Sequence, residues 1–251
     1  MRTIDLNADL GETVGGVPTA DDEAMFAVVS SASVACGGHA GDAASMRDAV
    51  ARGIRHGVAI GAHPSYPDRA RFGRAVLTIA PAELRSSVAA QLDALAAAGA
   101  DVRYVKPHGA LYHAAGSGAV VADAVVAAVA DLAARIGRPL PLLGLGGALA
   151  VSAARAGLPF VREAFLDRGY LDDGSLVPRG SAGDLLHDPR EAADRALRLV
   201  GHGEIVAVDG AVVSTDAASL CLHGDTAESV AMARAVRAAL DGAGIAVRAP
   251  W

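Results

Sequence analysis

Short apolar segments alternate with longer helix-like segments along the whole sequence, and this alternation constrains the fold more than any other feature. The segments that we expect to be strands are 4–7, 33–36, 58–62, 102–106, 140–145, 160–165, 204–208 and 220–222. The segments that we expect to be helices are 22–31, 43–56, 81–98, 120–136 and 227–240. Strands that alternate with helices pair in parallel through right-handed crossovers. The pattern therefore predicts an α/β protein.

The number of repeating units narrows the architecture further. Seven or eight strand–helix units follow one another without a linker, which predicts a closed or nearly closed barrel. A doubly wound open sheet is the alternative. With 251 residues, of which 52% are hydrophobic, the chain has enough apolar side chains for one large core. We expect a single domain over residues 1–251.

The charge and the cysteine content exclude several classes of protein. The formal net charge is −6 and the basic residues are scattered, which argues against nucleic acid as a partner. The two cysteines, Cys36 and Cys221, do not indicate a disulfide scaffold. Charged residues interrupt the alanine-rich stretches before any of them reaches transmembrane length, and the first residues lack the apolar core of a signal peptide. We expect a soluble, cytoplasmic protein without a membrane partner.

Polar and ionisable residues gather at the points where the expected strands end. In chain order they are Asp5, Asn7, Asp9, Glu12, His39, Asp42, His63, Asp68, Lys106, His108, Glu163, Asp167, Arg168, His223 and Asp225. The carboxyl ends of the parallel strands of a barrel share one rim, where active sites form. We therefore expect these side chains to lie together around one site.

Two of these residues are also unusual in the composition. Lys106 is the only lysine of the chain, since the 22 basic residues otherwise consist of arginine, and Asn7 is the only asparagine. In a sequence so rich in arginine, a lysine that persists is expected to act as a compact point charge or a titrating amine. Its ammonium group could neutralise a carboxylate or phosphate, or polarise a carbonyl.

Four of the eight histidines also follow expected strands, each beside a glycine or a proline: His39, His63, His108 and His223. Histidines and carboxylates that converge suit general acid–base work on a small substrate, or a metal site with nitrogen and oxygen ligands. The sequence contains no His-x-x-x-His or Cys-x-x-Cys spacing, so metal ligands would have to come from distant segments. Both kinds of chemistry remain open at this point.

Two other segments allow a functional and a structural interpretation. Cys36 and His39 could form a nucleophile–base pair, but a small buried strand cysteine is the favoured interpretation. The glycines of segment 144–147 could cradle a phosphate before a helix, although the segment lacks the P-loop lysine and the full dinucleotide fingerprint. Tight packing is the favoured interpretation there.

Several motifs, taken in order, resemble the LamB/YcsF family. The matching stretches are Asp5-Leu-Asn-Ala-Asp-Leu-Gly-Glu12, Ala35-Cys-Gly-Gly-His-Ala-Gly-Asp42, Gly61-Ala-His-Pro64, Val105-Lys-Pro-His-Gly-Ala-Leu-Tyr112, Glu163-Ala-Phe-Leu-Asp-Arg-Gly-Tyr170, Leu176-Val-Pro-Arg179 and Leu222-His-Gly-Asp-Thr226. They span nearly the whole chain.

The resemblance implies a fold, a reaction and partners. The fold is an irregular, roughly seven-stranded β/α barrel of the glycoside hydrolase/deacetylase kind. The reaction is the opening of 5-oxo-L-proline to L-glutamate by a 5-oxoprolinase, coupled to hydrolysis of ATP, a co-substrate expected to carry Mg²⁺. The partners are 5-oxoprolinase subunits B and C, with this chain as the A subunit of the complex.

Roles for individual residues follow from the resemblance and from the chemistry of the reaction. Catalytic roles are expected for Lys106, His108, His63, Asp9 and Glu12, with the histidines and a carboxylate positioning and deprotonating water. Lys106 would offset negative charge that develops on the amide or phosphoryl oxygen. Substrate-binding roles are expected for Asn7, His39, Glu163, Arg168, Arg179 and His223, with Arg168 or Arg179 pairing with the substrate carboxylate.

Two other functions are compatible with the same residues. A metal-dependent amidohydrolase or deacetylase that acts alone would use Asp9, His39 and His63 as ligands. A non-catalytic scaffold or regulatory subunit would not need ionisable residues clustered on one rim.

Overall fold

Seven parallel strands form a closed barrel in the computed structural model, which describes residues 2–224 and 228–251. In chain order the strands are β1 (Thr3–Leu10), β4 (Ser31–Ala35), β5 (Ala59–His63), β6 (Tyr104–Val105), β7 (Leu142–Gly144), β8 (Phe160–Phe165) and β11 (Ser219–His223). Each strand pairs with the next in sequence, and β11 returns to pair with β1, where Asn7 lies opposite Cys221. The prediction of a roughly seven-stranded barrel is confirmed, and the open sheet is excluded.

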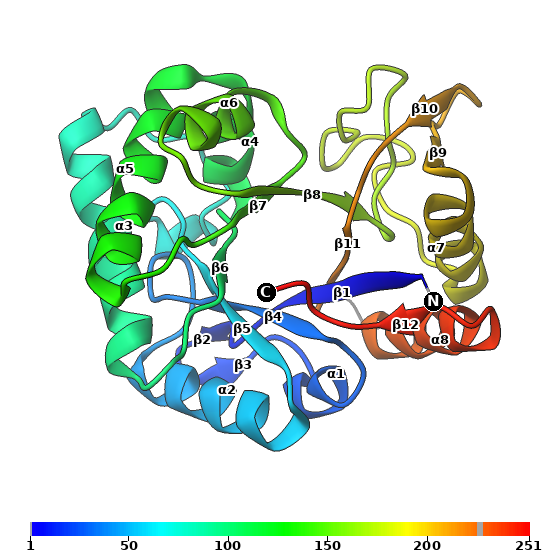
Figure 1. The fold of residues 1–251 in the computed structure, drawn as a ribbon, viewed down its shortest axis with the longest axis horizontal. Coiled ribbons are helices and arrows are strands. Elements are labelled where there is room, and N and C mark those ends of the chain that lie inside the picture. The colour runs from blue at the N-terminus through cyan, green and yellow to red at the C-terminus, as the bar shows by residue number, and fades with distance from the viewer. Residues whose placement is uncertain (1, 225–227) are drawn as a thin grey trace.

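Eight α-helices surround the barrel in the described part of the chain (Figure 1). They are α1 (Asp22–Phe26), α2 (Ala43–His56), α3 (Pro81–Ala97), α4 (Gly109–Ser117), α5 (Ala119–Ile136), α6 (Gly147–Arg155), α7 (Pro189–His202) and α8 (Ser229–Gly242). A short 3₁₀ helix, η1 (Arg69–Arg71), follows β5. None of the helices among the described residues is both long and apolar enough to span a membrane.

Local sequence explains where the helices begin and end. Asp42 caps α2 by accepting from the backbone N–H groups of Ala44 and Ser45, while the Ser45 hydroxyl binds the backbone N–H of Asp42. Gly57 ends the same helix in the left-handed conformation, with a φ of 67°. Pro81 occupies the first turn of α3, where its missing N–H is not needed.

Two expectations about the elements need correction. The expected helix 22–31 stops at Phe26, because Ser31 already starts β4. The expected strand 204–208 is β9 (Glu204–Val206), which pairs antiparallel with β10 (Val212–Ser214) outside the barrel. A turn at Gly210, with a φ of 90°, reverses the chain there and prevents a crossover. The expected start of the last helix at Ala227 lies outside the described residues.

Three helices and four short strands were not expected from the sequence, and one of these strands is β10 of the hairpin just described. The helices are α4, α6 and α7. The alanine-rich segments of α4 and α6 lack a strong amphipathic pattern, and α7 follows a long loop. The hairpin of β2 (Thr13–Val14) and β3 (Val17–Pro18) follows β1, and β12 (Ala246–Val247) pairs with the start of β1. These additions lie outside the closed barrel and leave its topology unchanged.

The amino-terminal end of the barrel is filled by a polar cluster and an aromatic pair. The buried carboxylate of Asp5 accepts hydrogen bonds from the hydroxyls of Ser30, Ser31 and Ser219. Trp251 stacks on Tyr104 with ring centroids 4.3 Å apart, and the C-terminal residues cross the barrel in Figure 1. Asp5 therefore lies at the opposite end of the barrel from the candidate site, although the sequence pattern grouped it with the residues at the carboxyl ends of the strands.

Candidate active site

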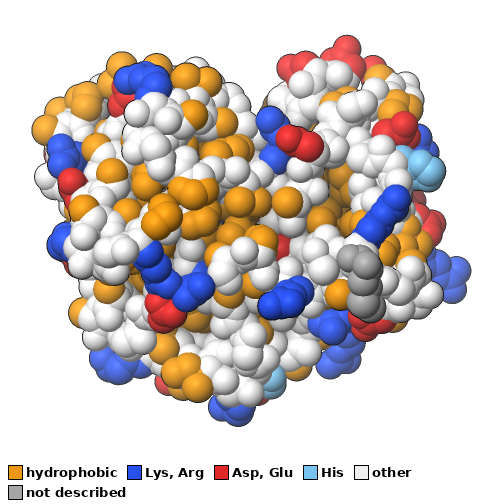
Figure 2. Space-filling model, in the orientation of Figure 1, with side chains coloured by type: hydrophobic (Ala, Val, Ile, Leu, Met, Phe, Trp, Pro, Cys, Tyr) orange, Lys and Arg blue, Asp and Glu red, His pale blue; other side chains and the backbone are white. Residues whose placement is uncertain are grey.

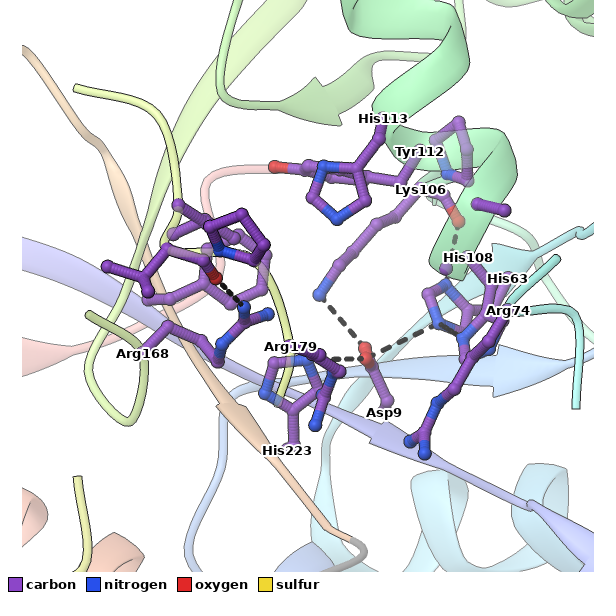
Figure 3. A pocket seen from close by; sticks show the side chains of 17 residues that line it. Asp9, His63, Arg74, Lys106, His108, Tyr112, His113, Arg168, Arg179 and His223 are labelled. Carbon is purple, nitrogen blue, oxygen red and sulfur yellow. Dashed lines mark hydrogen bonds and ion pairs between the residues drawn. The ribbon is translucent and has the colours of Figure 1, made fainter. Parts of the chain in front are cut away.

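A cavity of about 430 Å³ opens at the carboxyl ends of the barrel strands (Figure 3). Seven of the predicted site residues line it: Asp9, His63, Lys106, His108, Arg168, Arg179 and His223. The other four, Asn7, Glu12, His39 and Glu163, are buried behind this lining. The barrel thus brings the side chains of strands far apart in sequence to one site, as parallel strands in a barrel do.

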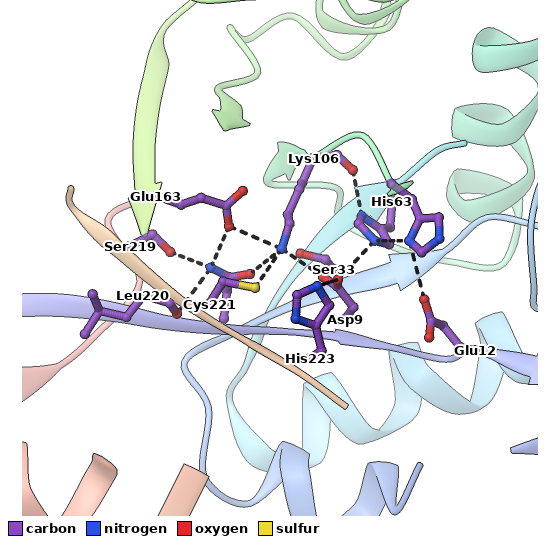
Figure 4. Close-up of polar contacts among 12 residues, drawn as sticks. Asp9, Glu12, Ser33, His63, Lys106, Glu163, Ser219, Leu220, Cys221 and His223 are labelled. Atoms are coloured by element: carbon purple, nitrogen blue, oxygen red, sulfur yellow. Dashed lines mark hydrogen bonds and ion pairs between the residues drawn. The ribbon is translucent and has the colours of Figure 1, made fainter. Parts of the chain in front are cut away.

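Lys106 lies at the centre of a buried polar network (Figure 4). Its Nζ atom lies 2.9 Å from Oδ1 of Asp9 and 3.2 Å from Oε2 of Glu163. It also donates to Oδ1 of Asn7 at 3.1 Å and to Sγ of Cys221 at 3.0 Å. The amide nitrogen of Asn7 in turn donates to Ser219 Oγ and to Glu163 Oε2. The only lysine and the only asparagine of the chain are therefore direct partners.

The charges of this network fix the protonation of its members. Burial alone would lower the pKa of Lys106, but the carboxylates of Asp9 and Glu163 raise that pKa well above its ordinary value. Burial would raise the pKa of Asp9, but His63 and Lys106 hold it well below its ordinary value. An ammonium group and a carboxylate therefore face each other across the floor of the cavity at neutral pH.

Backbone carbonyls orient two of the histidines. Nδ1 of His63 lies 2.7 Å from the carbonyl oxygen of Lys106, and Nε2 of His108 lies 3.0 Å from the carbonyl oxygen of Phe72. A carbonyl oxygen can only accept, so each of these nitrogens carries a proton. The remaining ring nitrogens, Nε2 of His63 and Nδ1 of His108, face each other at 3.0 Å.

His39 and Glu12 form a second layer behind these histidines. Nε2 of His39 lies 3.1 Å from Oε1 of Glu12, and the ring of His39 stacks on that of His108 at 3.7 Å. Burial, together with the neighbouring histidines, lowers the pKa of both His39 and His108 well below the ordinary value. The two stacked rings are therefore neutral at physiological pH.

Two groups of side chains lie close enough together to bind a metal ion. The first consists of Asp9, His63 and His108, and the second of Glu12, His39 and His108. Within each group the potential ligand atoms all lie within 4.8 Å of one another. The expected ligand set of Asp9, His39 and His63 is thus divided between the two groups, and His108 belongs to both.

His223 forms an ion pair on the opposite wall of the cavity. Its Nδ1 lies 2.8 Å from Oδ2 of Asp167, which also accepts from the backbone N–H of His223. Burial would lower the pKa of His223, but Asp167 raises it above the ordinary value. The ring stacks on Phe165 at 5.3 Å, which fixes its orientation toward the cavity.

The two predicted arginines differ in their contacts. Arg168 is buried, and its guanidinium donates to the carbonyl oxygens of Val177 and Asp184 at 2.7 and 2.9 Å. Arg179 is exposed at the cavity and has no hydrogen bond or ion pair with any residue that the structure describes. Arg168 therefore holds the loop that carries Arg179, whose guanidinium is available to a ligand.

Residues that the sequence did not single out complete the cavity. Arg74 and Tyr112 line it, although the latter belongs to the motif that begins at Val105. Phe72 and Gly73 form the turn against His108, and a Cβ on Gly73 would lie only 2.8 Å from Cβ of His39. The sequence feature that could have pointed to these residues is the Phe-Gly-Arg segment 72–74, which directly follows the short helix η1.

Two buried polar atoms near the floor of the cavity lack partners of normal geometry among the described residues. They are the hydroxyl oxygen of Tyr112 and Oε1 of Glu163. An unsatisfied buried polar atom costs roughly 1–3 kcal/mol of desolvation free energy, which a bound ligand could offset. Of the two residues, Tyr112 lines the cavity, so its hydroxyl is the one placed to meet a ligand there, whereas Glu163 lies behind the lining.

The two ambiguous sequence segments are now accounted for. The Cys36 thiol donates to the carbonyl oxygen of Val34, and burial raises its pKa to about 12, as expected for a structural cysteine. At Gly147 a Cβ would lie 2.2 Å from the backbone carbonyl oxygen of Gly116, which confirms the expectation of tight packing. The residues Asp225 and Thr226 of the last motif lie outside the described residues.

A second cavity of about 750 Å³ lies beside β8, between α6 and the β9–β10 hairpin. Figure 2 shows the surface notched between these elements. Of the predicted site residues, Glu163 lines this cavity and contacts the network of Lys106 from that side. The two cavities are therefore separated by the Lys106–Glu163 ion pair.

Comparison with known proteins identifies the family. The model of the LamB/YcsF family matches residues 4–250, almost the whole chain. The chain belongs to the LamB/YcsF family. Its membership confirms the resemblance drawn from the motifs, which supply most of the lining of the cavity.

Relatives within the LamB/YcsF family match along their full length. The chain is 47% identical to a protein of Cutibacterium acnes that is named as the A subunit of 5-oxoprolinase, covering 99% of each chain. A crystal structure described as "Lactam Utilization Protein" from Thermus thermophilus matches with a TM-score of 0.91 at 42% identity, covering 98% of this chain and 99% of that one.

The barrel of the family also resembles that of a deacetylase. The structure of "T48 deacetylase with substrate" matches with a TM-score of 0.52 at 14% identity, covering 98% of this chain and 87% of the deacetylase. At this identity the likeness concerns the fold alone. It agrees with the expected deacetylase-like barrel.

Proposed function

We propose that this chain is the A subunit of an ATP-dependent 5-oxoprolinase, which opens 5-oxo-L-proline to L-glutamate together with subunits B and C. The observation that carries the proposal is the full-length match to a relative named as the same subunit of 5-oxoprolinase, with the ionisable motifs gathered around one cavity. The cavity has the size of a small-molecule site. It also combines cationic, anionic and apolar walls.

The chemistry of a lactam explains why the reaction is coupled to ATP. The amide carbonyl of a five-membered lactam is a poor electrophile, so that water attacks it slowly. Transfer of the γ-phosphoryl group of ATP, carried with Mg²⁺, to the amide oxygen would make the ring carbon a better acceptor for water. Attack by water, cleavage of the ring C–N bond and release of phosphate then give glutamate.

Lys106 and the histidines have complementary tasks in this proposal. The ammonium group of Lys106 offsets negative charge that develops on the amide or phosphoryl oxygen, an effect of roughly 3–4 kcal/mol for a preorganised donor. Asp9, His63 and His108 hold the attacking water at the floor of the cavity, because their polar atoms converge there. Glu12 and His39 support His108 from behind.

Substrate binding uses the walls of the cavity. Arg179 pairs with the carboxylate of 5-oxo-L-proline, since its guanidinium lines the cavity without a protein partner among the described residues. His223 lies across from it and is held by Asp167. Tyr112, which lines the cavity, offers the lactam amide its hydroxyl group, which lacks a partner of normal geometry among the described residues. Phe165 covers an apolar face of the ring.

The decisive experiment measures 5-oxoproline-dependent ATP hydrolysis and glutamate formation by the purified chain, with and without its B and C subunits. We expect both products in equal amounts, and only when all three subunits are present. An exposed ion pair far from the cavity, Arg85 with Asp131, supplies the control variant Arg85→Gln. Asp9→Asn is expected to abolish glutamate formation, and Arg85→Gln to leave it unchanged.

Two results would contradict the proposal in different ways. Opening of an amide by the chain alone, without ATP, would support a stand-alone amidohydrolase or deacetylase. Normal glutamate formation by a complex that contains Asp9→Asn would instead support a scaffold or regulatory subunit.

A further inference from the structure

The two ring nitrogens that face each other in the cavity floor cannot form an ordinary hydrogen bond if both rings are neutral. Nδ1 of His63 and Nε2 of His108 already donate to backbone carbonyls, so the facing atoms, Nε2 of His63 and Nδ1 of His108, both present lone pairs. They lie 3.0 Å apart. Two lone pairs at this distance repel each other unless a cation lies between or beside them.

The carboxylate of Asp9 lies at a suitable distance to serve as a third ligand beside the two histidines. Oδ2 of Asp9 lies 3.4 Å from Nε2 of His63, while the other oxygen of Asp9 is bound to Lys106. Ligands about 2.1 Å from a tetrahedral ion lie roughly 3.4 Å from one another. The separations of 3.0 Å between the two histidines and 3.4 Å between His63 and Asp9 lie just below this value and at it, respectively, and all three ligand atoms lie within 4.8 Å of one another.

The group also has the surroundings of a functional metal site. Backbone carbonyls fix the tautomer of each histidine, as is usual for metal-bound imidazoles. All three side chains line the cavity, so that a further coordination position faces the ligand space. His39 does not line the cavity, and its Nε2 is directed at Glu12.

We infer that Asp9, His63 and His108 bind one divalent transition-metal ion, with an open coordination position in the cavity. Two imidazole nitrogens and one carboxylate favour Zn²⁺ or a neighbouring ion such as Co²⁺ over Mg²⁺, which prefers oxygen ligands. This ligand set differs from the expected set of Asp9, His39 and His63 in one residue, because His108 takes the place of His39. Its open position would coordinate an oxygen atom of water or of a carbonyl group.

Metal binding is measured directly on the purified full-length chain, after dialysis against a chelator. Titration with Zn²⁺ by calorimetry is expected to give one tight site per chain, and Co²⁺ is expected to give the visible absorption of a tetrahedral or five-coordinate ion. His63→Gln and His108→Gln should each weaken the binding by at least about 100-fold, since even supporting residues around metal sites contribute 10–100-fold. Mg²⁺ at the same concentration should not bind.

A matched control separates this site from adventitious histidine binding. His113 also lines the cavity but is exposed and belongs to neither metal-binding group, so that His113→Gln should retain the wild-type affinity. Circular dichroism of each metal-free variant shows whether it is folded. If folding is lost in the glutamine variants, Asp9→Asn and the Co²⁺ spectrum of the wild type provide the same test.

The inference would be overturned by either of two results. One is a wild-type chain that binds less than one equivalent of Zn²⁺ or Co²⁺, in which case a shared proton lies between the histidines. The other is wild-type affinity in a folded His63→Gln or His108→Gln variant. The measurement uses neither substrate nor partner subunits, so failure of the proposed reaction leaves it untouched.

Discussion

The Nζ atom of Lys106 lies 2.9 Å from Oδ1 of Asp9, although 97 positions separate the two residues in the sequence. Asp9 belongs to β1 and Lys106 follows β6, two strands that are not neighbours in the barrel. The contact therefore crosses the interior, where both side chains are almost completely buried. It places one compact cation and one carboxylate on the floor of the cavity, where Figure 3 shows them facing each other.

Replacement of Lys106 tests whether a compact ammonium group is required. In the reconstituted three-subunit enzyme, both Lys106→Arg and Lys106→Met are expected to lower kcat for glutamate formation by at least about 100-fold. The larger guanidinium does not fit among Asn7, Glu163 and Cys221 without displacing them. Lys106→Met should also lower the free energy of unfolding by roughly 3–5 kcal/mol, because it leaves buried carboxylates without their cation. Near wild-type turnover of Lys106→Arg would contradict this role.

Arg179 and Arg168 are expected to respond differently to substitution. Arg179→Ala should raise KM for 5-oxo-L-proline roughly 10–100-fold with little change in kcat, since it removes a charged partner of the carboxylate. Its free energy of unfolding should stay within about 0.5 kcal/mol of the wild type, because the side chain is exposed. Steady-state kinetics and urea unfolding check the two expectations.

Arg168→Ala is the matched comparison for Arg179→Ala. It should lower the free energy of unfolding by roughly 2–4 kcal/mol, because the carbonyl oxygens of Val177 and Asp184 lose a charged donor. An unchanged stability of Arg168→Ala, or an unchanged KM of Arg179→Ala, would reverse the assignment of the two arginines.

Gly73 is expected to be essential for the position of His108. Its φ is 64°, and a Cβ would lie 2.8 Å from Cβ of His39 and 3.1 Å from Cδ2 of His108. Gly73→Ala should therefore lower the free energy of unfolding by roughly 2–4 kcal/mol and reduce glutamate formation. Urea unfolding and the coupled assay measure the two effects.

Gly57 provides a control with the same backbone conformation. Its φ is 67°, but nothing lies within 4 Å of a Cβ built there. Gly57→Ala should cost about 1 kcal/mol, the strain of the left-handed conformation alone, and should not affect the reaction. Equal effects of the two substitutions would show that contact with the histidines does not matter.

The His223–Asp167 pair is expected to stabilise the fold in a limited range of pH. The pKa of His223 is raised by Asp167, so its contribution is complete below the ordinary value of 6.5 and is lost as the pH rises through the higher folded value. The pKa of Asp167 is lowered, so its contribution is present above the ordinary value of 3.8 and is lost as the pH falls. The pair therefore stabilises most between these two values.

A double-mutant cycle with His223→Gln and Asp167→Asn measures this contribution. We expect a clear coupling free energy in urea unfolding at about pH 5.5 and a smaller one at about pH 9. Asp9 and Arg179 also face the ring of His223, and the cycle cancels their separate effects. A coupling that does not change with pH would show that charge is not its source.

The sequence by itself determined the α/β class and the membership of most of the site, whereas the pairing of β11 with β1 decided for a closed barrel over an open sheet. Strand-like and helix-like segments alternate, and polar residues follow the strands, which are local properties that do not depend on distant contacts. Parallel pairing then brings the strand ends to one rim, so that Asp9, His63, Lys106 and His108 could be grouped before their contacts were known. The short β9–β10 hairpin was misplaced because its apolar run has the pattern of a barrel strand.

Only the tertiary structure decided which atoms meet. Strand register and the shape of the loops placed Asp5 at the opposite end of the barrel, bound Arg168 to carbonyl oxygens and left Arg179 at the cavity. The same contacts directed the lone pairs of His63 and His108 toward each other, because their other nitrogens bind carbonyl oxygens of residues distant in sequence. Local patterns fix where a strand ends, but a hydrogen-bond partner depends on how separate segments pack.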